Sequence, residues 1–275
     1  MKLLVTGAGG MLGSRFAGPG VVGLSHSDLD VTDADAVRRS IEDARPDVVI
    51  NCAAWTDVDG AEADEAGATR LNGYAAGFVA AAAAAVGATV VQPSSDYVFD
   101  GSKRTPYVES DAVAPQSAYG RSKLAGEQAV AAANERHFIV RTSWLYGPSG
   151  RNFVDTMLGL GRDRDELRVV DDQVGRPTYT GHLAEALAAL AGSDAYGIHH
   201  VAGGGEPCSW FEFAGAIFEE AGVEVRLTPC TTEEFPRPAP RPAYSVLDSE
   251  RSDSVRIPEW RSGLSAYLAG RSVAR

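Results

Sequence analysis

A glycine-rich turn directly after the first predicted strand is the feature that most constrains the fold. Residues Gly7-Ala8-Gly9-Gly10-Met11-Leu12-Gly13 read as GxxGxxG between a strand expected at 2–6 and a helix expected at 11–16. Glycines at these positions let backbone amides approach a pyrophosphate at the N-terminus of the helix. The spacing is weak evidence in a chain with 30 glycines, so its position after the first strand carries the argument. The turn predicts a dinucleotide site.

Short β-branched runs alternate with helical windows over the first 145 residues. This alternation predicts a parallel sheet that is covered by helices on both faces. We expect strands at 2–6, 21–25, 47–52, 89–93 and 138–142, and helices at 11–16, 34–44, 72–86 and 116–133. Right-handed crossovers then give an α/β fold, a Rossmann-type doubly wound parallel sheet with a smaller C-terminal substrate lobe.

The alternation loosens after residues 147–150, Gly-Pro-Ser-Gly. We therefore expect residues 1–148 to form an NAD(P)-binding Rossmann domain. Residues 149–275 are expected to form mainly a substrate-binding lobe, with a part that returns to the Rossmann sheet. Helices are expected at 152–160, 180–191 and 209–221, and the proline-rich stretch 236–242 is interpreted as an ordered loop rather than a polyproline ligand.

The charge balance excludes some classes of partner. Acidic residues number 37 against 25 basic ones, for a formal charge of -12. This disfavours a nucleic-acid groove or an anionic membrane as partner. The lysines are Lys2, Lys103 and Lys123, so arginine supplies the other basic residues. That bias leaves two explanations open, a GC-rich genome and a salt-rich cytosol.

The cysteines indicate neither a disulfide framework nor a zinc site. Cys52, Cys208 and Cys230 are an odd number and lack CxxC spacing, so we expect no bound metal. The first strand begins at residue 2, which leaves no room for a signal sequence, and no apolar run reaches membrane-spanning length. We expect a cytoplasmic protein.

The pair Tyr119 and Lys123 is a more informative motif than the glycines. Residues four apart lie on one face of a helix, so the phenol and the ammonium are close enough to interact. The lysine charge is expected to lower the pKa of Tyr119 toward neutrality, which would suit a general acid. A surface tyrosine stacked on a lysine stem is the structural alternative.

Two further sites depend on where strands end. Ser95 follows the fourth expected strand, and the carboxyl ends of strands face the ligand crevice in a doubly wound sheet. A serine there is more often turn chemistry, so Ser95 becomes a candidate only if Tyr119 and Lys123 converge on it. The second strand ends at residues 24–28 without an acidic residue immediately at its tip. Serines and a histidine there favour NADP, assisted by Arg15, with NAD kept open.

Taken together, these motifs resemble the extended short-chain dehydrogenase/reductases, and within them the dTDP-4-dehydrorhamnose reductases. The likeness runs nearly end to end, and the order and spacing of its parts are more specific than any one of them. The matching stretches are 6–13, 29–33, 51–59, 95–101, 119–127, 141–144, 152–153, 172–178 and 241–245. The resemblance implies reduction of the C4 keto group of dTDP-4-dehydro-L-rhamnose to dTDP-L-rhamnose by NADPH, with NADH as a second option.

The same resemblance implies a role for individual residues. Ser95 takes the position of the catalytic Thr/Ser, Tyr119 that of the proton donor, and Lys123 that of the residue that holds the nicotinamide ribose. The implied cofactor-binding residues are Gly7, Gly10, Met11, Leu12, Gly13, Asp30, Val31, Ala54, Trp55, Thr56, Tyr119 and Lys123. The implied substrate-binding residues are Thr56, Val58, Ser95, Tyr97 and Trp144.

Some alternative functions stay open at this point. Another nucleotide-sugar reductase or epimerase of the same family would share the motifs. Tyr97 stands where the related dehydratases carry a carboxylate, which disfavours dehydration. A regulatory subunit of methionine adenosyltransferase, which binds NADP as a partner protein, is a rival of a different class. A homodimer is compatible with the family, but Ser14-Arg15 offers no carboxylate for the magnesium bridge of some relatives.

Overall fold

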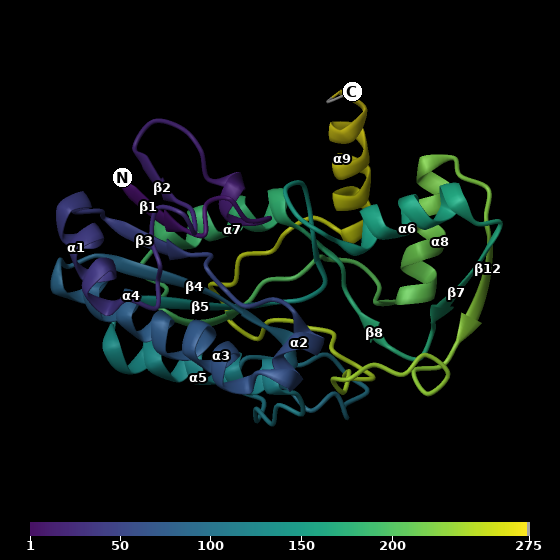
Figure 1. Ribbon diagram of the computed structural model, residues 1–275, viewed down its shortest axis with the longest axis horizontal. Coiled ribbons are helices and arrows are strands. Elements are labelled where there is room, and N and C mark those ends of the chain that lie inside the picture. The colour runs from purple at the N-terminus through teal and green to yellow at the C-terminus, as the bar shows by residue number, and fades with distance from the viewer. Residues whose placement is uncertain (274–275) are drawn as a thin grey trace.

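Six parallel strands within residues 1–273, the part that the computed structural model describes, form the central sheet (Figure 1). Their bounds are β1 (Leu3–Thr6), β2 (Val21–Leu24), β3 (Val48–Asn51), β4 (Thr89–Ser95), β5 (His137–Thr142) and β10 (Gly197–His200). They lie in the order β10-β5-β4-β3-β1-β2, and each neighbouring pair is parallel. All six carboxyl ends therefore share one edge. The predicted Rossmann-type doubly wound sheet is confirmed.

The first five strands lie where the sequence predicts them, and the sixth was not predicted. Strand β10 pairs with β5 and comes from the second half of the chain. Its sequence, Gly-Ile-His-His, has a single β-branched residue and two histidines, so its pattern is weak. This strand forms because it pairs with the edge of β5, and not because its own residues favour a strand.

Three helices cover one face of the sheet: α1 (Ala34–Ala44), α4 (Ala75–Ala85) and α5 (Ala118–Ala133). Helix α1 begins where Asp33 accepts hydrogen bonds from two amides of the first turn. The alanine-rich α4 packs closely on α5. A Cβ atom added at Gly77 would come within 3.2 Å of the Ala129 side chain, so a larger residue would not fit easily. The small residues of α4 therefore serve close helix packing.

Helix α7 (Thr180–Ala191) covers the opposite face (Figure 1). Its Leu183, Leu187 and Leu190 are fully buried in one cluster with Phe138 and Val140 of β5. Each such side chain contributes roughly 1.5–3 kcal/mol by leaving water. Both α7 and β10 therefore complete the sheet from residues beyond 148.

The prediction of a helix at 11–16 is wrong. Only a 3₁₀ turn, Gly13–Arg15, stands between β1 and β2. The chain then passes through Gly18-Pro19-Gly20, where both glycines have positive φ and proline lacks an amide proton. These residues end the turn before an α-helix can form. Two short helices that were not predicted, α2 (Val58–Ala63) and α3 (Glu65–Thr69), precede a π turn at Arg70–Tyr74.

The remaining elements form a second lobe beside the sheet (Figure 1). Its helices are α6 (Phe153–Asp163), α8 (Trp210–Ala221) and α9 (Trp260–Val273). Its strand pairs are β7 (Glu166–Val170) with β12 (Arg226–Cys230), β8 (Val174–Gly175) with β11 (Cys208–Ser209), and β6 (Leu145–Tyr146) with β9 (Thr178–Tyr179). An aromatic core that includes Tyr146, Phe213 and Trp260 holds this lobe together. The helices expected at 152–160, 180–191 and 209–221 are confirmed.

A buried ion pair joins α5 to the sheet. Arg141 of β5 donates two hydrogen bonds to the Glu127 carboxylate, at 2.9 and 2.8 Å, and both side chains are 3–4% exposed. Ser94 of β4 donates a third hydrogen bond to the same carboxylate, at 2.6 Å. A buried charge must be paired, so this carboxylate fixes how α5 sits on β4 and β5.

Replacing Arg141 with Met should lower the free energy of unfolding by about 3–5 kcal/mol, because Glu127 would stay buried without its counter-charge. Urea denaturation measures this loss. Arg38→Met is the matched control, since Arg38 forms exposed pairs on α1 and should lose no more than about 1 kcal/mol. Equal losses in the two variants would contradict the importance of the buried pair.

Candidate active site

The candidate site lies at the edge where the parallel strands end. In the register of the sheet, Thr6 is paired with Asn51 and Ser95 with Thr142. The turn after β1, the segments after β3 and β5, and Ser95 at the end of β4 therefore meet at one edge. Most of the predicted site residues come from these four positions.

Ser95 and Tyr119 come together as predicted. Helix α5 begins one residue before Tyr119, where Ser117 accepts a hydrogen bond from the Gly120 amide. A side chain at Gly120 would come within 2.2 Å of the Tyr97 carbonyl, so the start of α5 packs directly on the turn that follows Ser95. This contact brings the Ser95 hydroxyl within hydrogen-bonding reach of the Tyr119 phenol.

The Tyr119 phenol keeps its proton more firmly than the sequence suggested. Burial raises its pKa to about 12, and the adjacent Ser95 hydroxyl only partly opposes this rise. The expected fall toward neutrality is therefore wrong for this structure. The physical reason is that burial removes the water that would stabilise a phenolate. Tyr119 thus carries its proton at neutral pH and can give it away.

Lys123 lies one helical turn beyond Tyr119 and is 6% exposed. Its Nζ donates a hydrogen bond to the Pro93 carbonyl on β4, at 2.8 Å. Burial lowers the pKa of Lys123 to about 8, while the negative charge of Glu127 opposes the fall. The buried ion pair of Glu127 and Arg141 therefore supports the charge of Lys123 as well as the position of its helix.

Asp96 is a further buried acid beside Ser95. Burial raises its pKa to about 6, opposed first by a hydrogen bond from Ser245 and then by one from Ser95. The Ser95 hydroxyl lies 3.0 Å from Asp96 Oδ1. Within residues 1–273, the other carboxylate oxygen has no hydrogen-bond partner. The sequence places Asp96 next to Ser95, yet nothing in the pattern indicated that its side chain turns inward.

The glycine-rich turn fits a dinucleotide. Gly7 has φ of +61°, and a side chain there would come within 2.7 Å of the Ala53 amide. A side chain at Gly13 would come within 2.2 Å of the Gly7 carbonyl. In the described chain, the amides of Met11 and Leu12 donate to no acceptor. Free amides on a glycine-rich turn are what a pyrophosphate requires, although no α-helix follows here.

The tip of β2 carries a carboxylate after all. Asp28 Oδ2 accepts hydrogen bonds from the Ser25 amide, at 2.8 Å, and from the Ser25 hydroxyl, at 2.5 Å. These bonds lower the pKa of Asp28, so the carboxylate is ionised at neutral pH. Arg15 lies over the Tyr179 ring instead of facing this tip. The sequence placed serines and a histidine here, assisted by Arg15. The structure adds the carboxylate, because the turn folds Asp28 back onto Ser25.

Asp30 and Val31 follow this turn. Asp30 is exposed and accepts two hydrogen bonds from Thr32, whereas Val31 is buried in the core beneath the sheet edge.

The segment after β3 is held by an asparagine that sequence reasoning missed. Asn72 lies in the π turn, which places its buried side chain under Trp55. It accepts a hydrogen bond from the Trp55 amide, at 2.8 Å, and donates to the Trp55 carbonyl and to Ser122 on α5. Trp55 thus packs with Tyr119 against one small cluster of alanines, Ala61, Ala68 and Ala118. An interruption of the helical pattern at residue 72 is the only sequence signal for this role.

The loop 236–242 reaches across from the second lobe. Arg237 and Arg241 both pair with Asp59 on α2, at 3.1 and 3.0 Å. Arg241 also lies near Tyr97, where its charge opposes the rise in the pKa of Tyr97 caused by burial. A small cavity of about 120 Å³ between Tyr97 and Arg241 marks this junction. The proline-rich stretch is an ordered loop, as predicted, and it connects the two lobes.

Trp144 adopts an unusual backbone conformation. Its φ is +49°, a left-handed conformation that costs a bulky residue about 1–3 kcal/mol. Hydrogen bonds from Thr178 to the Trp144 carbonyl and from Ser143 to the Arg176 carbonyl hold this conformation. Strain of this kind is concentrated at functional sites, so the prediction of Trp144 as a site residue gains a structural reason.

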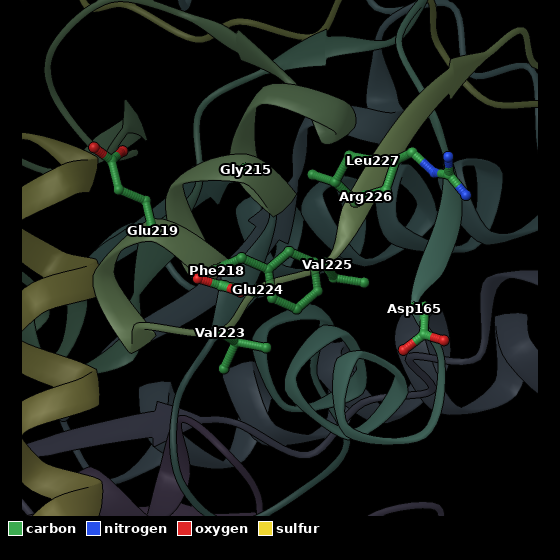
Figure 2. A pocket seen from close by; sticks show the side chains of 9 residues that line it. All are labelled: Asp165, Gly215, Phe218, Glu219, Val223, Glu224, Val225, Arg226 and Leu227. Carbon is green, nitrogen blue, oxygen red and sulfur yellow. The ribbon is translucent and has the colours of Figure 1, made fainter.

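A groove elsewhere does not belong to this site. It lies between α8, β7 and β12 in the second lobe, with a volume of about 560 Å³ (Figure 2). Its lining residues are Asp165, Gly215, Phe218, Glu219, Val223, Glu224, Val225, Arg226 and Leu227. None of the predicted site residues lines this groove.

The described residues contain neither a metal-binding cluster nor a helix that could span a membrane. Among residues 1–273, no three His, Cys, Asp or Glu side chains gather closely enough to hold a metal ion. The same residues include no helix with the length and apolar character needed to cross a bilayer. His199 and His200 bond to backbone carbonyls of different segments, which indicates a packing role for both.

The fold and the site together define a dinucleotide-dependent oxidoreductase. Its parts are a doubly wound sheet, an open glycine-rich turn after β1, and a hydroxyl, a phenol and an ammonium at the carboxyl edge. The family model described as the RmlD substrate binding domain matches residues 1–272. The chain belongs to this family.

Relatives of known structure and sequence support this membership. The chain is 45% identical to the dTDP-4-dehydrorhamnose reductase of Mycobacterium tuberculosis, over 98% of this chain and 92% of that protein. A crystal structure of a dTDP-4-dehydrorhamnose reductase from Clostridium acetobutylicum matches with a TM-score of 0.95 and 46% identity, over 99% of this chain and all of that one. The Bacillus anthracis dTDP-4-dehydrorhamnose reductase in complex with NADP matches with a TM-score of 0.95 and 40% identity, over 98% of this chain and 100% of that chain.

Gly13→Ala should lower the free energy of unfolding by about 1–3 kcal/mol, because the added methyl group would push against the Gly7 carbonyl. Gly159→Ala on α6 is the matched control, since no atom lies within 4 Å of the new methyl group. That control should be neutral or stabilising by up to about 1 kcal/mol. Urea denaturation of both variants checks the prediction, and equal effects would contradict the tight packing of the turn.

Proposed function

We propose that this chain reduces the C4 keto group of dTDP-4-dehydro-L-rhamnose to dTDP-L-rhamnose with NADPH, with NADH as a second option. The observation that carries this proposal is the meeting of Ser95 and Tyr119 at the sheet edge, with Lys123 one helical turn away. The relatives named dTDP-4-dehydrorhamnose reductase support the choice of substrate.

The residues present suit the cofactor, which supplies a hydride when bound. We assign the pyrophosphate to the turn of Gly7, Gly10, Met11, Leu12 and Gly13, where the amides of Met11 and Leu12 donate to no acceptor within residues 1–273. Asp30 and Val31 would meet the adenine. Ala54, Trp55 and Thr56 would line the cofactor beyond β3, while Tyr119 and Lys123 hold the nicotinamide ribose.

Tyr119 and Ser95 handle the oxygen of the C4 keto group. Tyr119 carries its proton at neutral pH and gives it to that oxygen as negative charge develops there. The single Ser95 proton points to Asp96 in the free enzyme and turns to the same oxygen when substrate is bound. The positive charge of Lys123 lies on the same helix face and favours loss of the Tyr119 proton at that moment.

Four side chains from three segments would hold the substrate around these groups. Thr56 and Val58 follow β3, Tyr97 follows β4, and Trp144 follows β5. The Tyr97 ring meets the Tyr119 ring edge to face, with 5.5 Å between their centroids. This contact ties a substrate-binding side chain directly to the proton donor.

The cytoplasmic location and the homodimer stay predictions. A reductase that needs NADPH and a nucleotide sugar must share a compartment with both, which agrees with the expected cytoplasmic location.

Tyr119→Phe should fold normally and lose turnover by about 10²–10⁴-fold, because the change removes the proton donor and little else. Absorbance of NADPH with dTDP-4-dehydro-L-rhamnose made in situ measures the rate. Tyr196→Phe, which alters a remote partly exposed phenol near Arg136, is the matched control and should keep the wild-type rate. A Tyr119→Phe variant with wild-type turnover would refute the assigned role.

The same assay separates the alternatives. An epimerase recycles its cofactor, so it would convert the sugar without net consumption of NADPH. A regulatory subunit would bind NADPH and show no turnover with any nucleotide sugar.

Asp28→Asn should raise the preference for NADPH over NADH by about fivefold, because a 2′-phosphate would no longer face a negative charge worth about 1 kcal/mol. The ratio of kcat/KM for the two cofactors measures this preference. Asp35→Asn removes an exposed charge on α1 and should leave the ratio unchanged. An unchanged or lower ratio in Asp28→Asn would show that this carboxylate does not face the ribose.

A further inference from the structure

Two tryptophans form a stacked pair in the second lobe. The rings of Trp144 and Trp210 lie face to face, with 3.5 Å between ring centroids and 6° between ring planes. Trp210 is the first residue of α8, so 66 positions of sequence separate the two rings. Phe153 also packs against Trp210, at 4.6 Å between centroids. One face of the Trp144 ring is thus fully occupied by Trp210.

Gly175 supports the Trp144 ring from another direction. A side chain at Gly175 would lie 2.6 Å from Trp144 Cε2 and 2.7 Å from Nε1. Gly175 belongs to β8, whose partner β11 ends at Ser209, the residue directly before Trp210. Gly175 and Trp210 therefore come from one two-stranded ribbon, which clamps the Trp144 ring.

This pair differs from ordinary core packing in three ways. Both rings are partly exposed, although they belong to an aromatic cluster. The backbone of Trp144 is held in a strained left-handed conformation. Within residues 1–273, the Trp144 indole N–H has no acceptor, so it is free to donate to a ligand.

The position of Trp144 connects this clamp to the chemistry. Thr142 is paired with Ser95 in the sheet, and Trp144 follows two residues later. The Cα atoms of Trp144 and Ser95 are therefore at most about 12 Å apart. A nucleotide sugar with its C4 keto group at Ser95 and Tyr119 would extend over this distance.

We propose that Trp210 is a positioning residue that, together with Gly175, fixes the Trp144 ring so that the exposed part of this ring, with its indole N–H, contacts the nucleotide-sugar substrate. The inference rests on the proposed function and deepens it. Trp210 acts through Trp144 and does not itself touch the reacting atoms. Its loss should weaken substrate binding and leave cofactor binding unchanged.

A double-mutant cycle tests this role. Trp210→Leu should raise the KM for the nucleotide sugar about tenfold, because the interaction energy of an aromatic pair corresponds to about this factor in binding. The KM for NADPH should stay within about twofold of wild type. In a Trp144→Leu background, Trp210→Leu should add less than about twofold, because the ring that it positions is already gone. Full additivity of the two changes would overturn the proposal.

Two further variants distinguish the proposed positioning role of Trp210 from a folding defect. Trp210→Phe keeps an aromatic face and should recover most of the wild-type KM. Gly175→Ala pushes a methyl group into the Trp144 ring and should raise the substrate KM in the same selective way. If Trp210→Leu does not fold, Gly175→Ala decides the question. A wild-type substrate KM in Gly175→Ala would overturn the proposal.

A matched control lies next to Trp210. Phe211 is a half-buried aromatic residue on the same helix, and within residues 1–273 its ring contacts neither tryptophan ring. Phe211→Leu should leave both KM values unchanged. If it raises the substrate KM as much as Trp210→Leu does, the effect is general loosening of the lobe and the proposal fails. Absence of turnover in the wild type would overturn the proposed function and this inference with it. If the wild type is active but the variants raise the KM for NADPH as much as the KM for the nucleotide sugar, the inference alone is overturned.

Discussion

The buried carboxylate of Glu127 determines where the reactive groups lie. It accepts two hydrogen bonds from Arg141 on β5 and one from Ser94 on β4, and these three contacts position α5 against the sheet. Ser94 is directly followed by Ser95, and Glu127 lies one helical turn after Lys123. A shift of α5 along the sheet would leave a charge unpaired in the interior, which is costly. The convergence of the site is therefore a consequence of the need to pair one buried charge.

The sequence was a good guide to elements with a regular pattern. Helix α1 has the predicted bounds, because an aspartate cap precedes an amphipathic window and a left-handed residue ends it. Prediction failed where tertiary packing overrides local preference. Strand β10 forms because the edge of β5 needs a partner, although two of its four residues are histidines. The expected helix at 11–16 is only a 3₁₀ turn, because two glycines and a proline follow too soon.

The candidate site likewise contains residues that could be predicted from the sequence and residues that could not. Ser95, Tyr119 and Lys123 could be predicted, since strands of a parallel sheet end at one edge and residues four apart share a helix face. The direction of the pKa shift of Tyr119 could not, because burial depends on neighbours from several segments. Asp28, Asn72 and Trp210 were missed for a related reason. A turn that folds back, a π turn and a ring stack across the lobe have no periodic signature.

The sheet also has a consequence for synthesis on the ribosome. Strand β10 and helix α7 come from the second half of the chain, yet they cover the edge of β5 and one face of the sheet. Roughly 60 residues separate the end of β5 from the end of β10, which takes roughly 3–12 s to translate at about 5–20 residues per second. During that interval Phe138 and Val140 lack their final cover, and an unpaired strand edge is open to wrong partners. The nascent chain is thus most in need of chaperones after helix α5 has already been made.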